Sequence, residues 1–314
     1  DSPKVERCRA EAEAVVAAAA AGFQRRMARQ GGADARWLQK AKEAGTVSDK
    51  VAAATLLIRE SAVANLGSLD MLLNWVTRNK GGKIVVGQAV EALKELFATG
   101  VLLPDRKLRF FHDQPLPLAG KGEARAQRLL YWHIEDCIKT RYFRFVEAVE
   151  ALSRDNLPFL KEKALGAAFE LLRGKSENEA RNLTILVNKL GDPDRKVASK
   201  AGFFLGEVLA EHPMMKAVVV KEVEYFLFRP GLKVKARYAG VIFLTQIMLS
   251  RREAEGGSEL AEKLIQVYVT LFDVCMQDAD RELAVARRRD RALNLKAKAK
   301  KKKTPGGKGK GKGG

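Results

Sequence analysis

The most suggestive short motif in the sequence is a Gly-Lys-Ser triplet at residues 174–176. A phosphate-binding loop needs a further glycine five residues before this triplet and a preceding strand, because backbone amides must surround the phosphates. The required position is Phe169, and the residues before the triplet have a helical pattern. We therefore interpret the triplet as the end of one helix, with Ser176 as the N-cap of the next.

Two further pairs of side chains have residue types that perform chemistry. His133 and Cys137 lie four residues apart and would share one face of a helix, but no nearby Cys or His pair completes a metal site. Glu135 and Asp136 are adjacent, so on a helix they point about 100° apart, which is a poor geometry for shared acid–base catalysis. We predict a protein that is not an enzyme and has no cofactor, no metal and no small-molecule substrate.

The remaining candidates for function are basic residues with the chemistry to contact phosphate groups. They form two clusters in nearly corresponding places of two helices, a third cluster beside Phe110 and Phe111, and a C-terminal set. The candidates for RNA binding are Arg195, Lys196, Lys200, Lys233, Lys235, Arg237, Arg106, Lys107, Arg109, Arg287, Arg288, Arg289, Lys300, Lys301, Lys302 and Lys303.

Each cluster has two interpretations. The first two clusters would line up in a repeat protein as a basic stripe that follows a phosphate backbone. They would otherwise be a solvated face with local ion pairs to Asp194, Glu207 or Glu222. The third cluster resembles an RNA-stacking patch, but we favour a role for Phe110 and Phe111 in anchoring the core.

Most of the positive charge lies at the C-terminal end. The formal net charge is +19. Residues 281–314 contain 14 Lys and Arg and two acids, which gives +12 and leaves 19 − 12 = +7 for the other 280 residues. A Lys- and Gly-rich segment of this kind buries too little apolar surface to fold by itself. We therefore predict a disordered basic tail that favours nucleic acid or another acidic partner.

The composition sets further limits. The 314 residues are 46% apolar, enough for a sizeable core, and no apolar run approaches the ~20 residues of a membrane span, so we expect no membrane association. The three cysteines are widely spaced, which suits a reducing compartment. The chain begins with Asp1 rather than Met, and we expect that it is a fragment or has been trimmed.

Apolar residues recur at steps of three and four through most of the chain, and no stretch alternates with a period of two, which predicts an all-α fold. Thr46 and Asp49 form a predicted capping box, and a short helix is expected around Trp37 and Leu38. Residues 100–122 should form a long ordered loop before a long helix. We predict an Ala-rich helical extension at 1–33, a HEAT-like α-solenoid at 34–280 and the disordered tail at 281–314.

A repeat of 37 residues supports the solenoid. Asp155, Asp192 and Arg229 are separated by 37 residues each, and Leu160, Val197 and Val234 follow them at the same distance. Ala164, Ala201 and Tyr238, and then Ala168, Leu205 and Ile242, continue the series. In the corner before the second helix, Gly191 should adopt a left-handed conformation, Asp192 should cap the helix, and Pro158, Pro193 and Pro230 should lie in first turns. Such paired helices are typical of HEAT repeats (the ARM/HEAT superhelix).

Several long motifs also carry a family resemblance. They are LVNKLGDPDRKVASKA, LLPDRKLRFF followed by QP, YWHIEDCIKTRYFRFVEAVEALSRD and FLFRPGLKVKARY. Together they closely resemble the CCAAT-binding factor and nucleolar complex family, of the CCAAT/enhancer-binding protein zeta type, over about residues 34–276. The Lys/Gly tail departs from this family, whose members continue into a second helical half.

The resemblance implies a HEAT-like solenoid that acts in the nucleus and nucleolus as an assembly factor of the large (60S) ribosomal subunit. It implies binding to pre-ribosomal RNA, to a second nucleolar complex protein and to other assembly factors. The alternatives are a transcription factor that binds CCAAT elements in DNA and a HEAT scaffold that binds protein only. No helix-turn-helix, zinc or basic-zipper signature is present in the sequence to support DNA reading.

Overall fold

The computed structural model describes residues 3–30, 38, 40, 41, 44–78, 82–249 and 257–303, with the backbone alone for residues 30 and 294–303. It separates into two units, residues 1–248 and 249–314, and each is described by itself. The regular elements of the described residues are all helices, and these residues include no β-strand. The helices are α1 (Pro3–Gln30), α3 (Val47–Glu60), α4 (Leu66–Thr77), α5 (Lys83–Ala98), η1 (Phe111–Asp113), η2 (Leu116–Ala119), α6 (Gly122–Ser153), α7 (Pro158–Gly174), α8 (Glu179–Lys189), α9 (Arg195–Glu211), η3 (Pro213–Met215), α10 (Lys216–Leu227), α11 (Val234–Thr245) and α12 (Gly257–Lys303).

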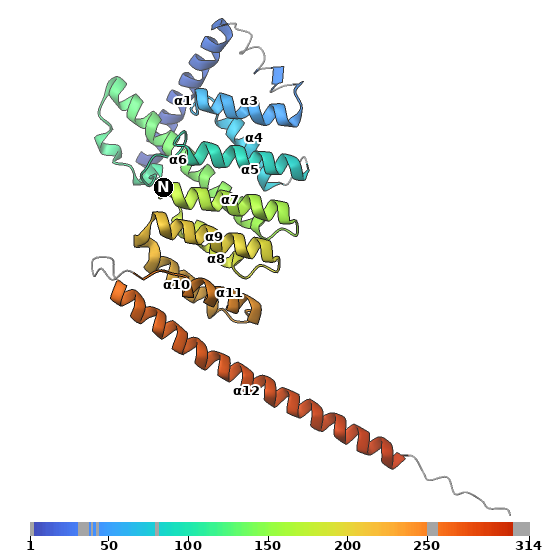
Figure 1. Cartoon of the computed structure of the whole chain (residues 1–314). Coiled ribbons are helices and arrows are strands. Elements are labelled where there is room, and N and C mark those ends of the chain that lie inside the picture. Colours follow the sequence, from blue (N-terminus) through green and yellow to red (C-terminus); the bar gives the residue numbers. More distant parts are fainter. Residues whose placement is uncertain are drawn as a thin grey trace, which may run out of the picture. The chain divides into compact units, whose positions relative to one another are not determined.

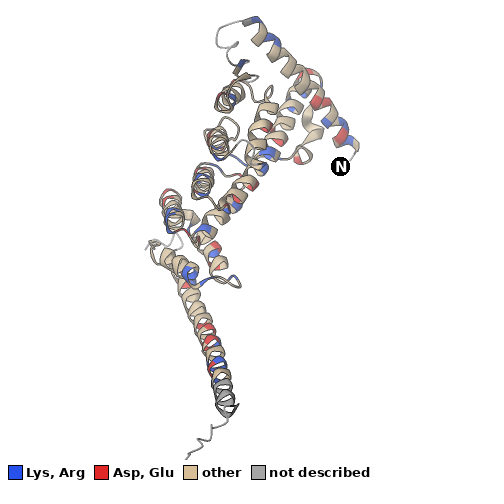
Figure 2. Cartoon of the chain, turned by 90° about the vertical axis from the view of Figure 1, so that its right-hand side faces the viewer, with Lys and Arg blue, Asp and Glu red and all other residues tan. Residues whose placement is uncertain are grey.

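The helices of the first unit stack in two rows (Figure 1). In one row, α5 packs between α3 and α7, and α7 packs against α9. In the other row, α6 packs between α4 and α8, and α8 packs against α10. Figure 2 shows the two rows as separate columns. The all-α prediction is confirmed. Because each helix contacts mainly its neighbours in sequence and in its row, the arrangement is compatible with a helical solenoid.

The predicted 37-residue period holds for α7 and α9, which begin at Pro158 and Arg195. Leu160, Ala164 and Ala168 of α7 are buried, and so are their partners 37 residues later, Val197, Ala201 and Leu205. The period also extends backwards, because buried Val86 of α5 precedes Leu160 by 74 residues, which is twice 37.

The predicted register is wrong for α11. Val234, Tyr238 and Ile242 are exposed, and the buried positions are taken by Ala236, Gly240 and Leu244, which follow Val197, Ala201 and Leu205 by 39 residues. The two additional residues have a local origin. Helix α10 is one residue longer than α8, and the corner 228–233 is one residue longer than the corner 190–194. Gly231, at φ +74°, provides the left-handed residue of the longer corner.

The corner before α9 also differs from the prediction. Asp194, not Asp192, is the N-cap, and its side chain accepts a hydrogen bond from the amide of Lys196 at 2.8 Å. Gly191 is not left-handed; a Cβ at this position would lie 2.7 Å from the Cβ of Ala236. The glycine is therefore required by close packing against α11. Among the three prolines, only Pro158 lies in a first turn, because Pro193 precedes an N-cap and Pro230 lies in the longer corner.

Helix α1, predicted as an N-terminal extension, packs against α6. Ala12 of α1 is buried in a cluster with Phe111, Ala119 and Leu129. Two ion pairs flank this cluster, Arg9 to Asp136 at 3.1 Å and Glu11 to Arg125 at 2.8 Å. The predicted capping box of Thr46 and Asp49 at the start of α3 is confirmed. The short helix predicted around Trp37 lies mostly outside the described residues.

Helix α12 corrects the predicted start of the disordered tail. The helix continues to Lys303, well beyond residue 281. Ala, Leu, Arg and Lys dominate this stretch and have high helix propensity, so the fading of the apolar period does not end the helix. Residues 304–314 lie outside the described part. None of the described helices combines the length and hydropathy of a bilayer-spanning segment.

Candidate nucleic-acid interface

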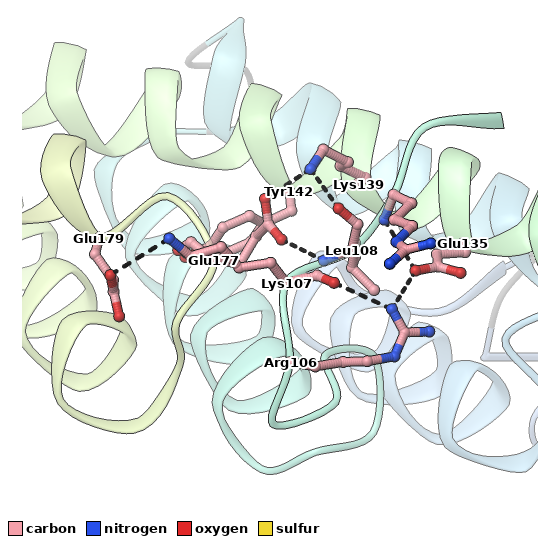
Figure 3. A network of polar contacts seen from close by, with 9 residues as sticks. Arg106, Lys107, Leu108, Glu135, Lys139, Tyr142, Glu177 and Glu179 are labelled. Carbon is pink, nitrogen blue, oxygen red and sulfur yellow. Dashed lines mark hydrogen bonds and ion pairs between the residues drawn. The ribbon is translucent and has the colours of Figure 1, made fainter. Parts of the chain in front are cut away.

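The loop that carries Arg106, Lys107 and Arg109 is fastened to α6 by Glu135 (Figure 3). Arg106 forms an ion pair with this carboxylate at 2.5 Å, and the backbone amide of Arg109 donates to the same oxygen at 2.9 Å. The side-chain amide of Gln114 donates to the second carboxylate oxygen at 3.0 Å. Burial raises the pKa of Glu135, but these donors outweigh it and hold the pKa below its ordinary value.

A buried ion pair between Lys139 and Glu177 holds the same loop at Leu108. The ammonium group of Lys139 lies 3.1 Å from Glu177 and donates to the carbonyl of Leu108 at 2.6 Å, while Glu177 accepts the amide of Leu108 at 2.6 Å (Figure 3). The hydroxyl of Tyr142 donates to the carbonyl of Glu177 at 3.1 Å. Sequence reasoning missed Lys139 and Glu177, because the two residues lie 38 positions apart and belong to no motif.

The third basic cluster is thus mostly engaged in contacts within the protein. Arg106 pairs with Glu135, and Lys107 lies 3.7 Å from Glu179. Phe111 is fully buried, which confirms its predicted core role, whereas Phe110 is half-buried and stacks on His112. The side chain of Arg109 is exposed and is the member of this cluster with the greatest freedom to contact a partner.

The cluster at the start of α9 has a different environment. Arg195 and Lys196 are exposed, and the described residues contain no acid in an ion pair with either side chain. The nearby acids have other partners: Asp192 binds Lys161 and Lys189, each at 3.0 Å, and Asp194 caps the helix. Lys200, one turn further along, is paired with Glu162 at 3.1 Å.

The cluster at the start of α11 lies close to that of α9, since Gly191 packs against Ala236. Lys233 and Lys235 are exposed, and no acid of the described chain forms an ion pair with them. Arg237 is half-buried and has an interaction of its own. The structure therefore brings together four unneutralised cations at two neighbouring helix starts, namely Arg195, Lys196, Lys233 and Lys235.

The C-terminal candidates lie on the second unit. Arg287, Arg288 and Arg289 are exposed on α12. The side chains of Lys300, Lys301, Lys302 and Lys303 lie outside the described part, so their place in an interface stays a prediction.

The residues considered for enzyme or metal chemistry make contacts within the fold. Lys175 pairs with Asp105 at 2.7 Å, and Asn178 rather than Ser176 is the N-cap of α8, so the predicted cap was wrong. His133 and Cys137 face each other, with Nε2 and Sγ 3.4 Å apart, and burial lowers the pKa of His133 and raises that of Cys137. Within the described residues, no group of three or more His, Cys, Asp or Glu is placed to hold a metal.

The described part of the chain is an all-helical protein that is compatible with a helical solenoid and carries exposed cations at the starts of α9 and α11. No family model matches the chain. It is 44% identical over 251 residues to Protein SLOW WALKER 2 of Arabidopsis thaliana and 40% identical over 258 residues to human CCAAT/enhancer-binding protein zeta. The two alignments cover 80% and 81% of this chain and 24% of each relative. It is 34% identical to Ribosome biogenesis protein NOC1 of Chaetomium thermophilum over 76% of this chain and 24% of that protein.

Over the aligned residues, the chain matches CCAAT-binding factors and nucleolar complex proteins. This confirms the resemblance drawn from the sequence motifs. The chain spans about a quarter of the length of the curated relatives it matches.

Proposed function

We propose that this chain is a HEAT-like scaffold of large-subunit ribosome assembly that binds pre-ribosomal RNA and partner assembly factors in the nucleolus. The repeated burial at Val86, Leu160, Val197 and Ala236 supports the HEAT-like repeat. The names of its relatives, which include ribosome biogenesis and nucleolar complex proteins, support the assembly role. No residue has a role in catalysis under this proposal.

One observation carries the RNA contact: four cations at two adjoining helix starts have no ion-pair partner among the described residues. A cation that is already paired gains little from a phosphate, because it must give up its first partner. Arg195, Lys196, Lys233 and Lys235 do not have this cost. The start of α11, which has no side-chain cap, adds partial positive charge from its backbone amides. Lys200 and Arg237 flank the four and would contribute less, because each already has an interaction.

The basic C-terminal region adds to this affinity in our proposal. Residues 281–314 carry a net charge of +12, and such a segment contributes sequence-independent attraction to RNA and a nuclear targeting signal. A second nucleolar complex protein and other large-subunit factors are the proposed protein partners, on the basis of the family relationship.

The charge proposal is tested by changing all four free cations to Gln in the full chain. RNA affinity should fall, and the slope of log K against log salt should become less steep by about 0.7 for each lost contact with a single strand, or about 2.8 in total. The matched control changes Lys4, Arg7, Arg26 and Arg29 of α1 to Gln, since these exposed residues remove the same charge elsewhere. Equal slopes for the two variants would contradict the proposal.

DNA binding is the second candidate, because two relatives are named CCAAT/enhancer-binding protein zeta. Competition separates the two: we expect structured RNA to displace a labelled CCAAT duplex, and the duplex to compete poorly against bound RNA. A scaffold that binds protein only would keep its nucleolar enrichment and show no change in RNA affinity after deletion of residues 281–314.

A further inference from the structure

Two exposed aromatic side chains lie on α9 and α11, further along these helices than the four free cations at their starts. Phe203 on α9 is 62% exposed and Tyr238 on α11 is 66% exposed. Each lies on the helix that begins with two of the free cations. We infer that this face binds single-stranded RNA, with the cations holding phosphates and the two rings stacking on bases. The inference rests on the proposed function and specifies the class of RNA.

Helix geometry places cation and ring on one side of each helix. Lys196 and Phe203 are seven residues apart, so they lie two turns apart on the same side, about 10 Å along the axis. Lys235 and Tyr238 are three residues apart and lie about 4.5 Å apart along the axis of α11. The buried residues of the two helices, which include Val197 and Ala236, lie on other sides of these helices. Phosphate contacts and ring contacts therefore open onto the same solvent-facing side.

The ring of Phe203 has aromatic neighbours. Its centroid lies 6.0 Å from that of Phe204, and Phe204 in turn stacks on Phe169 with ring centroids 4.3 Å apart and planes 3° apart. Lys200 lies 5.8 Å from the centre of the Phe204 ring. Phe203 thus lies beside a stacked aromatic pair while most of its surface stays open. Such a ring loses little conformational freedom when a base stacks on it.

The combination favours a single strand over a duplex. In A-form RNA the bases are stacked on each other and the major groove is too narrow for side chains, so an exposed ring finds no free base face. A single strand offers both charged phosphates and unstacked bases, and every base has a face that a ring can cover. A duplex would use the four cations and gain nothing from Phe203 or Tyr238.

The experiment changes both rings to leucine in the full chain, Phe203→Leu with Tyr238→Leu, and measures affinity for a short poly-uridine strand and for an RNA duplex of equal total charge. Loss of two stacking contacts should weaken single-strand binding about 30-fold, taking the lower end of the usual range for each ring, and should leave duplex binding within about twofold. Both rings are exposed, so the variant should keep the melting temperature of the wild type. Tyr131→Leu, which removes a ring of 60% exposure from α6, is the matched control and should change neither affinity.

A second readout does not depend on affinity. Poly-uridine that contains 4-thiouridine should crosslink to the peptides with Phe203 and Tyr238, and the crosslinks should disappear in the double variant. An unchanged single-strand affinity, an equal loss for strand and duplex, or crosslinks confined to other helices would each overturn the inference. The Gln variant of the four cations separates the two proposals. If it binds both RNAs like the wild type, the charge proposal fails. If the Gln variant loses binding and the double leucine variant does not, the charge proposal stands and the stacking inference fails.

Discussion

The loop cluster at Arg106 and Lys107 and the corner clusters of α9 and α11 look alike in the sequence, because both are short basic runs near aromatic residues. Their surroundings differ. Arg106 and Lys107 each meet a carboxylate of another helix, whereas Arg195 and Lys235 meet none in the described chain. The comparison teaches that pairing, rather than the number of basic residues, separates cations that stabilise the fold from cations that are available to a ligand.

The largest expected effect tests the structural side of this comparison. Lys139→Met leaves Glu177 buried without a counter-charge, which should lower the free energy of unfolding by about 3–5 kcal/mol. Urea denaturation followed by circular dichroism measures the change. Lys107→Met is the control, since its side chain is exposed, and it should cost less than about 1 kcal/mol. If both variants were equally stable, the loop would not depend on the buried pair.

The second prediction concerns how the corner clusters are positioned. Gly191→Ala places a methyl group 2.7 Å from the Cβ of Ala236 and 2.9 Å from the ring of Phe226, so α11 must shift at a cost of about 1–3 kcal/mol. Gly206→Ala on the same stretch is the control. Nothing lies within 4 Å of its new methyl group, and alanine in a helix should stabilise by about 0.5–1 kcal/mol. Thermal melts of the two variants should move in opposite directions.

The sequence predicted those features that depend on neighbouring residues. The capping box of Thr46 and Asp49 requires a spacing of three, and the 37-residue period of α7 and α9 follows from helices and corners of fixed length. The period failed at α11 because one extra residue in α10 and one in the corner moved the buried side to Ala236. A comparison of residue types could not detect that shift. At a spacing of 37 residues, Val234 matches Val197, and both are valines.

The candidate site was predicted less completely than the fold. The basic clusters were found from local composition, but their partners were not, because Arg106 and Glu135 lie 29 positions apart. The same holds for the role of Asp192, which was expected to cap α9 and instead joins Lys161 of α7 to Lys189 of α8. Choosing among many possible ion pairs requires the packing of the helices, which sequence patterns do not give.

A third prediction uses pH to separate the clusters. The folded-state pKa of Glu135 lies below its ordinary value, so its contribution to stability is present above the unfolded-state pKa of about 4.3 and is lost as the pH falls through the lower folded value. The melting temperature should therefore decrease when the pH is lowered below about 4.5, and Glu135→Gln should make this acid dependence less steep. The Gln variant of the four free cations should keep the wild-type pH dependence, because those residues have no carboxylate partner.

The smallest effect is expected when the two paired cations of the loop are removed. Arg106→Gln combined with Lys107→Gln removes two cations whose charges are already offset by Glu135 and Glu179. RNA affinity should therefore change by less than about twofold. Arg195→Gln combined with Lys196→Gln removes the same charge from the corner and should reduce the salt slope by about 1.4. Filter binding at several salt concentrations compares the two variants directly. If the loop variant lost as much affinity as the corner variant, ion pairs in the free protein would not predict which cations bind RNA, and Arg106 and Lys107 would return to the interface.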